Sequence, residues 1–254
     1  MTEVACGIDI GGSGIKAAVV DLSTGEFVGE RVRIATPQPA TPAAVADVCA
    51  QLLEQLGVGE DIPVGVAFPS PVLHGVIPFI ANLDPSWAGT NIIDVMKEHT
   101  GRTMVPLNDA DAAGLAEIAY GAAKGVGGIV IVTTLGTGIG SAIVNDGVLL
   151  PNTELGHLEL DGYDAETRAS SGQKTKQDLS WKKWAKRLQR YYSHVEMLFS
   201  PDLFVVGGGV SKNHEKFMPL LDLKTPMVPA QLFNTAGIAG AAWYAAQQTA
   251  KARE

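Results

Sequence analysis

The chain has 254 residues, of which 46% are hydrophobic and 18% are charged, and its formal net charge is -8 at pH 7. This composition excludes a disordered or fibrous chain, the acidic balance argues against general binding to nucleic acid, and no apolar run is long enough to cross a membrane. We therefore expect a globular, cytoplasmic protein that is long enough for two domains.

The first predicted elements form a hairpin with a glycine-rich turn. The turn Gly11-Gly12-Ser13-Gly14 joins two apolar runs, residues 4–10 and 15–20, and Asp9 and Lys16 flank it. Runs of this kind, rich in Val and Ile and bounded by glycine, predict buried strands. Glycine lets several backbone amides point at one ligand, which suits phosphate oxygens, although such turns also occur for geometry alone.

Strands and helices then alternate. The pattern predicts strands over residues 27–34, 63–68 and 104–107, and helices over 43–56 and 91–99. This alternation is typical of an α/β protein.

An acidic cluster opens the next helix, predicted to run from residue 108 to about 123. Asp109 follows the carboxyl end of a strand, where the ligand sites of α/β sheets concentrate, so its carboxylate could accept a proton from a substrate. Asp is also a common helix N-cap, and Asp111 competes for either role. Both interpretations of Asp109 remain open from the residues alone.

A second glycine-rich turn, residues 136–140, joins the apolar runs 129–132 and 141–144. Two such hairpins facing each other would hold a phosphate chain from both sides. Glu154 and His157 follow in a polar loop, three residues apart, so both can reach one ligand, although a lone histidine is more often structural. A third glycine-rich turn, residues 207–210, follows a strand at 203–206, and an alanine-rich helix at 236–250 closes the chain.

A basic segment distinguishes the second half of the chain. Residues 174–190 contain seven basic residues and one acid, on a helix predicted over about 179–199. Six apolar residues at helical spacing should face the core: Trp181, Trp184, Leu188, Tyr191, Val195 and Leu198. Lys182, Lys186 and Arg190 recur at four-residue steps, with Lys183 and Arg187 beside them. A solvated helix face is the simplest interpretation, but a long polyanion such as polyphosphate gains from each added cation.

The motifs together resemble a known family. The segments Asp9 to Lys16, Asn108-Asp109, Leu135 to Gly140, Glu154 to His157 and Val206 to Val210 occur in the order seen in ROK sugar kinases, of the hexokinase and actin superfamily. Within that family the chain is similar to the polyphosphate glucokinases and polyphosphate/ATP glucomannokinases. The resemblance implies a two-lobed, hexokinase/actin-like (ribonuclease H-like) α/β fold with a ligand cleft between the lobes. The small lobe would comprise residues 1–108, with the closing helix 236–254 packing back on it, and the large lobe 109–235.

The resemblance also implies a reaction. A terminal phosphoryl group would pass from inorganic polyphosphate, and from ATP, to the 6-hydroxyl of glucose, with mannose as a further candidate sugar, Mg2+ as the metal and a homodimer as the assembly. One alternative is an ATP-only hexose or N-acetylhexosamine kinase of the same fold. Another is a sugar-sensing protein without catalysis, although such a sensor would need no phosphate-binding hairpins.

The resemblance assigns roles to residues. Asp109 would be the catalytic base, and Asp9 would position Mg2+ through water. The implied sugar ligands are Asn82, Asn108, Asp109, Glu154, His157 and Glu166, with Glu159 as an alternative to Glu166. Asn82 lies in a turn with Trp87, which could also be a surface turn with one packed aromatic. The implied phosphate-binding residues are Gly11, Gly12, Ser13, Gly14, Lys16, Thr134, Gly136, Thr137 and Gly138. Gly207, Gly208 and Gly209 would approach a nucleotide.

One departure from the family concerns zinc. Many ROK proteins carry a cysteine cluster after the Gly-His motif that binds structural zinc with a histidine, whereas residues 160–172 contain no cysteine. Cys6 and Cys49 lie in apolar patterns that indicate core packing. We therefore expect neither zinc nor a disulfide.

Overall fold

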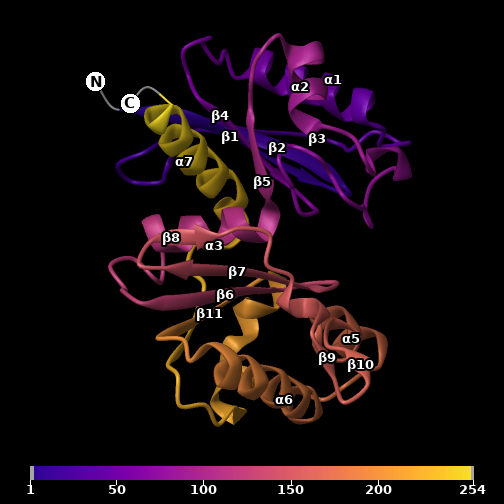
Figure 1. Ribbon diagram of the computed structural model, residues 1–254, viewed down its shortest axis with the longest axis vertical. Coiled ribbons are helices and arrows are strands. Elements are labelled where there is room, and N and C mark those ends of the chain that lie inside the picture. Colours follow the sequence, from indigo (N-terminus) through magenta and orange to yellow (C-terminus); the bar gives the residue numbers. More distant parts are fainter. Residues whose placement is uncertain (1–2, 253–254) are drawn as a thin grey trace.

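The computed structural model describes residues 3–252 and consists of two halves, each built around a five-stranded sheet (Figure 1). The ends of the predicted small lobe and closing helix, residues 1–2 and 253–254, lie outside the described residues. Within residues 3–252, no helix is long and apolar enough to span a membrane.

The two sheets repeat one topology. The first has the order β3-β2-β1-β4-β5 and the second β8-β7-β6-β11-β12, with antiparallel hairpins at the start of each half and parallel strands after them. The strands are β1 (Val4–Gly11), β2 (Gly14–Asp21), β3 (Phe27–Ile34), β4 (Val64–Phe68), β5 (Val105–Asn108), β6 (Ile129–Leu135), β7 (Ile139–Asn145), β8 (Val148–Leu150), β11 (Leu203–Gly207) and β12 (Met227–Pro229). A small hairpin pairs β9 (Glu159–Leu160) with β10 (Tyr163–Asp164).

Helices cover both faces of each sheet. They are α1 (Pro42–Gln55), α2 (Ile92–Thr100), α3 (Asp109–Ala119), α4 (Glu166–Ala169), α5 (Ser171–Lys176), α6 (Trp181–Phe199) and α7 (Ala236–Lys251). Short 3-10 turns are η1 (Pro85–Trp87), η2 (Leu155–His157), η3 (Gly209–Lys216), η4 (Met218–Leu220) and η5 (Phe233–Thr235). The helix predicted to reach residue 123 ends at Ala119, and every predicted strand is present.

Helices α3 and α7 pack against each other between the sheets (Figure 1). Helix α7 crosses β1 and β4 so closely that a Cβ at Gly7 or Gly65 would collide with its backbone, and a Cβ at Gly240 would collide with the carbonyl of Ala112 in α3. The chain's last helix therefore packs on the first sheet. We propose that the two lobes divide at residues 108 and 109, where β5 passes into α3.

Helix α6 covers the opposite face of the second sheet. Its buried Trp184, Leu188, Tyr191 and Val195 belong to one core cluster with Ile131 of β6 and Phe204 of β11. These four positions confirm the predicted core face. Trp181, also predicted on this face, is partly buried against the same cluster, whereas Leu198 was predicted to join it but is 51% exposed in the last turn of the helix.

Candidate active site

A cavity of about 620 Å³ lies between the two halves, where several parallel strands end. Both halves line it: Pro69, Ser70, Pro71, Phe79, Ala81, Asn82 and Asn108 from the first, and Asp109, Ala110, Thr134, Gly136, Thr137, Gly138, Ile139, Gly140, Ser141, Glu154, His157 and Glu166 from the second. The predicted base, sugar ligands and second glycine turn therefore meet around one space.

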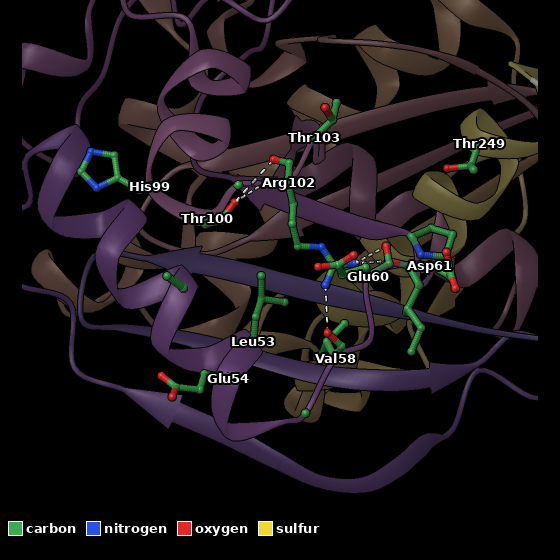
Figure 2. Close-up of a pocket in the computed structure, with 15 residues that line it drawn as sticks. Leu53, Glu54, Val58, Glu60, Asp61, His99, Thr100, Arg102, Thr103 and Thr249 are labelled. Carbon is green, nitrogen blue, oxygen red and sulfur yellow. Dashed lines mark hydrogen bonds between the residues drawn. The ribbon is translucent and has the colours of Figure 1, made fainter.

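A larger hollow, of about 780 Å³, contains none of the predicted site residues (Figure 2). It lies beside α1, the loop after it and the end of α2. Arg102 enters it and donates hydrogen bonds to the carbonyl oxygens of Val58, Gly59, Glu60 and Ile62. Because its guanidinium already donates to these backbone carbonyl oxygens, Arg102 serves to hold the loop between α1 and β4 in place.

Asp109 is the first residue of α3. The side chain of the preceding Asn108 caps the helix, accepting hydrogen bonds from the backbone N–H groups of Ala110 (2.9 Å) and Asp111 (3.2 Å). Asp109 is therefore not the N-cap, and its carboxylate is available to the cavity. Because Asn108 Oδ1 accepts both capping hydrogen bonds, its Nδ2 is the side-chain atom that can bind a ligand.

The surroundings of Asp109 favour a proton acceptor. Its side chain is exposed to the cavity, which is itself partly open to solvent. Desolvation by the surrounding protein and the nearby carboxylate of Asp9 together raise the pKa of Asp109 to about 6. A carboxylate with this pKa is ionised at neutral pH and is a stronger base than an ordinary aspartate.

Asp111 has a different environment. It is 1% exposed, does not line the cavity, and accepts a hydrogen bond from the backbone N–H of Asn152 at 2.7 Å. Burial raises its pKa to about 7. Because positions two apart on a helix point about 200° apart, Asp111 cannot share the orientation of Asp109.

Glu154, His157 and Glu166 approach the cavity from one side. His157 Nδ1 lies 2.7 Å from Asp164 Oδ2, and this hydrogen bond, with the surrounding carboxylates, raises the pKa of His157. Burial raises the pKa of Glu154. Glu166 accepts a hydrogen bond from the backbone N–H of Ile139 at 3.0 Å, whereas Glu159 is exposed in β9 and does not line the cavity. The geometry favours Glu166 over Glu159 as the third acid.

Three of these side chains could also hold a cation. The ligand atoms of His157, Asp164 and Glu166 all lie within 4.8 Å of one another.

Cys6 and Cys49 are buried and free, and burial raises the pKa of each to about 12, so both remain neutral thiols in the core. That the protein holds no zinc stays a prediction.

The second glycine turn forms part of the cavity wall. The N–H of Gly136 donates to the carbonyl of Gly138 at 3.0 Å, and the N–H of Gly172 donates to the carbonyl of Gly136 at 2.9 Å. A Cβ at Gly138 would collide with the carboxylate of Glu166. Glycine at this position therefore lets the Glu166 carboxylate lie against the turn, where a larger residue would displace it.

The first glycine turn lies next to the cavity wall without lining it. Gly12 packs against the backbone of Asn82, which does line the cavity, and Arg33 donates a hydrogen bond to the carbonyl of Ser13 at 2.8 Å. Lys16 Nζ lies 3.1 Å from Asp9 Oδ2. The predicted phosphate-binding residues of this hairpin therefore sit beside the space that Asp109 faces.

Trp87 does not line the site. It is fully buried, donates its indole N–H to the carbonyl of Ala40 at 3.0 Å, and packs against Phe68. The packed-aromatic interpretation is the correct one for this residue, while Asn82 lies at the cavity.

The third glycine turn connects β11 to η3. Gly208 has φ +81°, and a Cβ there would collide with the backbone of Leu135, the last residue of β6. Gly209 has open space around it. This turn and the second glycine turn thus lie against each other through Leu135.

The basic residues of α6 differ in their partners. Arg190 forms a two-pronged pair with Asp161 (Nη2 to Oδ1, 2.8 Å; Nε to Oδ2, 3.0 Å), and Arg187 donates to the carbonyl of Arg168 and to Gln177. Lys182, Lys183 and Lys186 are exposed, and none of them makes a salt bridge within the described part of the chain. The lysines are therefore the charges that remain free for an external anion.

Several residues at the site were not predicted from the sequence, and three of them carry polar or aromatic groups that bear on it. Ser70 and Phe79 line the cavity from the loop after β4, and Asp164 holds His157. The Pro69-Ser70-Pro71 turn after a predicted strand was the available signal for Ser70. Nothing in the local pattern distinguishes Asp164 from other exposed acids.

Comparison with known proteins identifies the family. The family model described as "ROK family" matches residues 5–176. The chain belongs to the ROK family. It is 52% identical to polyphosphate glucokinase of Mycobacterium tuberculosis over 93% of this chain and 89% of that protein.

Solved ROK structures agree. The inorganic polyphosphate/ATP-glucomannokinase of Arthrobacter sp. strain KM matches with a TM-score of 0.89 and 53% identity over 96% of this chain and 99% of that one. A ROK family glucokinase of Streptomyces griseus, in complex with glucose and AMPPNP, matches with a TM-score of 0.79 and 25% identity over 96% and 99%. The two halves are the lobes of the actin-like hexokinase fold of ROK sugar kinases, as the sequence predicted.

Proposed function

We propose that this ROK protein transfers the terminal phosphoryl group of inorganic polyphosphate, and of ATP, to the 6-hydroxyl of glucose, with mannose as a second substrate. The observation that carries the proposal is the placement of Asp109 in one cavity with Glu154, His157 and the second glycine turn. Similarity to a polyphosphate glucokinase and to a polyphosphate/ATP-glucomannokinase, each above 50% identity, supports the donor and the sugar.

Asp109 is the base in this proposal. Phosphoryl transfer mainly requires that the acceptor be positioned and that charge be neutralised, and a carboxylate orients the hydroxyl and accepts its proton. Asn82, Asn108, Glu154, His157 and Glu166 offer polar groups of the kind that orient a hexose.

The phosphate donor would meet backbone amides and a metal. Kinases of this kind depend on a divalent metal, and we propose Mg2+, which would neutralise phosphate charge during transfer. Asp9 fits a water-mediated role because Lys16 occupies Oδ2 and leaves Oδ1 available. The glycine turns at residues 11–14 and 136–138, with Thr134 and Lys16, are the proposed phosphate cradle, and Gly207, Gly208 and Gly209 the proposed nucleotide contact. A cytoplasmic location and a homodimer are further proposals.

A matrix of donors and sugars tests the function. Purified protein is assayed for sugar phosphate with polyphosphate or ATP as sole donor, and with glucose, mannose or N-acetylglucosamine as acceptor. Activity on glucose with both donors is expected. Activity with ATP alone would support the ATP-only kinase, and no sugar phosphate with any pair would support a sugar sensor.

The acid limb of the pH profile reports the base. Because Asp109 must be ionised and its pKa is about 6, kcat/KM for glucose should fall below that pH, by about tenfold per pH unit. Asp9 raises the pKa of Asp109, so Asp9→Asn should move the limb to lower pH whatever it does to the maximal rate. The pH profiles are measured in buffers of constant ionic strength. If the acid limb does not move in Asp9→Asn, the group that titrates is not Asp109.

Donor selectivity should depend on the free lysines of α6. Replacing Lys182 and Lys186 with Gln should raise the KM for long-chain polyphosphate several-fold and leave the KM for ATP nearly unchanged. Added salt should reduce the difference, because exposed charges are screened over roughly 8 Å at physiological ionic strength. Arg190→Gln is the matched control, since Asp161 already pairs with that charge. If the lysine variant and Arg190→Gln change the KM for polyphosphate equally, or if the KM values for both donors change equally, this helix face is only a solvated surface.

A further inference from the structure

The two walls of the cavity are joined by one side chain, Asn152. Its Oδ1 accepts a hydrogen bond from the backbone N–H of Val72 at 2.8 Å, and its Nδ2 donates to the carbonyl of the same residue at 3.1 Å. Val72 directly follows Ser70 and Pro71, which line the cavity from the first lobe. Asn152 comes two residues before Glu154, which lines it from the second.

Asn152 is itself held in place. Its backbone N–H donates to Asp111 Oδ2 at 2.7 Å, and its φ of +61° lies in the left-handed region that Asn tolerates better than most residues. The next residues are fixed to β7, because Ser141 Oγ accepts from the N–H of Leu155 at 2.9 Å and donates to the carbonyl of Thr153 at 2.6 Å. The amide of Asn152 therefore projects toward the first lobe from a segment anchored at α3 and β7.

We infer that Asn152 is a positioning residue that sets the spacing between the two walls of the sugar site. It contacts no reacting atom in this role. It holds the loop of Ser70 at a defined distance from the loop of Glu154 and His157, so that a hexose meets both walls at once. The inference rests on the proposed function in so far as these loops bind sugar. It also gives a role to Asp111, whose carboxylate fixes Asn152 rather than the substrate.

The role predicts a selective effect on the sugar. Two hydrogen bonds to one peptide group define both distance and orientation, and small displacements of a binding wall weaken substrate positioning strongly. Loss of the amide should therefore raise the KM for glucose about tenfold, an effect of the size expected for two net hydrogen bonds. The KM for the phosphate donor should stay within about twofold at saturating glucose, because the proposed phosphate cradle lies on other segments.

Asn152→Gly is the discriminating variant. Glycine keeps the left-handed backbone and the N–H bond to Asp111 while removing the side-chain amide. Asn152→Asp retains an acceptor for the Val72 N–H and should restore part of the glucose affinity. Asp146→Gly is the matched control, because Asp146 also has a positive φ (+46°) and binds a backbone N–H, that of Gly128, away from the cavity.

A second readout does not depend on activity. In wild-type protein without ligands, the Val72 amide should be protected from hydrogen exchange, and Asn152→Gly should reduce that protection while Asp146→Gly leaves it unchanged. An unchanged glucose KM in Asn152→Gly, an equal rise in the donor KM, or a Val72 amide unaffected by the variant would each overturn the inference. If the wild type fails to phosphorylate glucose but Val72 protection still depends on Asn152, the proposed function fails and the link between the walls stands.

Discussion

Asp109→Asn should lower kcat by about 10²- to 10⁴-fold, the range typical of the loss of a general base, while the KM for glucose changes little. The amide has nearly the shape of the carboxylate, and the helix cap comes from Asn108 and survives the substitution. Initial-rate measurements of sugar phosphate formation at saturating donor give both constants.

Asp111→Asn is the control for that experiment. Asn keeps an acceptor oxygen for the backbone N–H of Asn152 and removes a carboxylate that does not face the cavity. Its kcat should stay within a few-fold of the wild-type value. If Asp109→Asn retains near-normal turnover, or if Asp111→Asn loses as much, the assignment of the base is wrong.

Gly240→Ala should destabilise the protein, although Ala in a helix normally stabilises it by roughly 0.5–1 kcal/mol relative to Gly. A Cβ at Gly240 would collide with the carbonyl of Ala112, so α7 and α3 would have to move apart. Overpacking of this kind costs about 1–3 kcal/mol or more, which exceeds the gain in helix propensity. The melting temperature should fall by several degrees, and kcat/KM should fall with it because α3 carries Asp109.

Gly59→Ala is the control for backbone entropy alone. Gly59 is exposed and has an ordinary φ. A Cβ added there would lie 4.0 Å from Ile62 Cδ1, an ordinary van der Waals contact. Thermal unfolding of this variant should match the wild type or lie slightly above it. A stable Gly240→Ala protein with normal activity would contradict the close packing of α3 on α7.

The elements of the fold were predictable because their signals are local. Runs of Val and Ile ending at glycine mark the strands, and the same signal occurs in both halves, which is why both hairpins were predicted. Helix α6 was predicted from its apolar spacing, but Leu198 keeps that spacing and is nevertheless exposed. How far the core extends along a helix is a tertiary property that the spacing does not show.

The site was predicted less completely, because it depends on side-chain directions and on contacts between residues that are distant in the sequence. Asp109 and Asp111 carry one signal in the sequence, and they differ only in the direction that each side chain takes from α3. Arg190 looks like part of a cationic row until Asp161, 29 residues away, is found beside it. Asn152 and Val72 are 80 residues apart, so no local pattern could show that they join the two walls.

The most direct test of the central claim is phosphorus NMR of a reaction that contains the purified full chain, glucose, polyphosphate and Mg2+ without nucleotide. The account predicts a growing phosphomonoester signal of glucose 6-phosphate with the wild-type protein and a signal lower by orders of magnitude with Asp109→Asn. Release of inorganic phosphate without sugar phosphate, or a sugar phosphate that forms only when ATP is added, would contradict it.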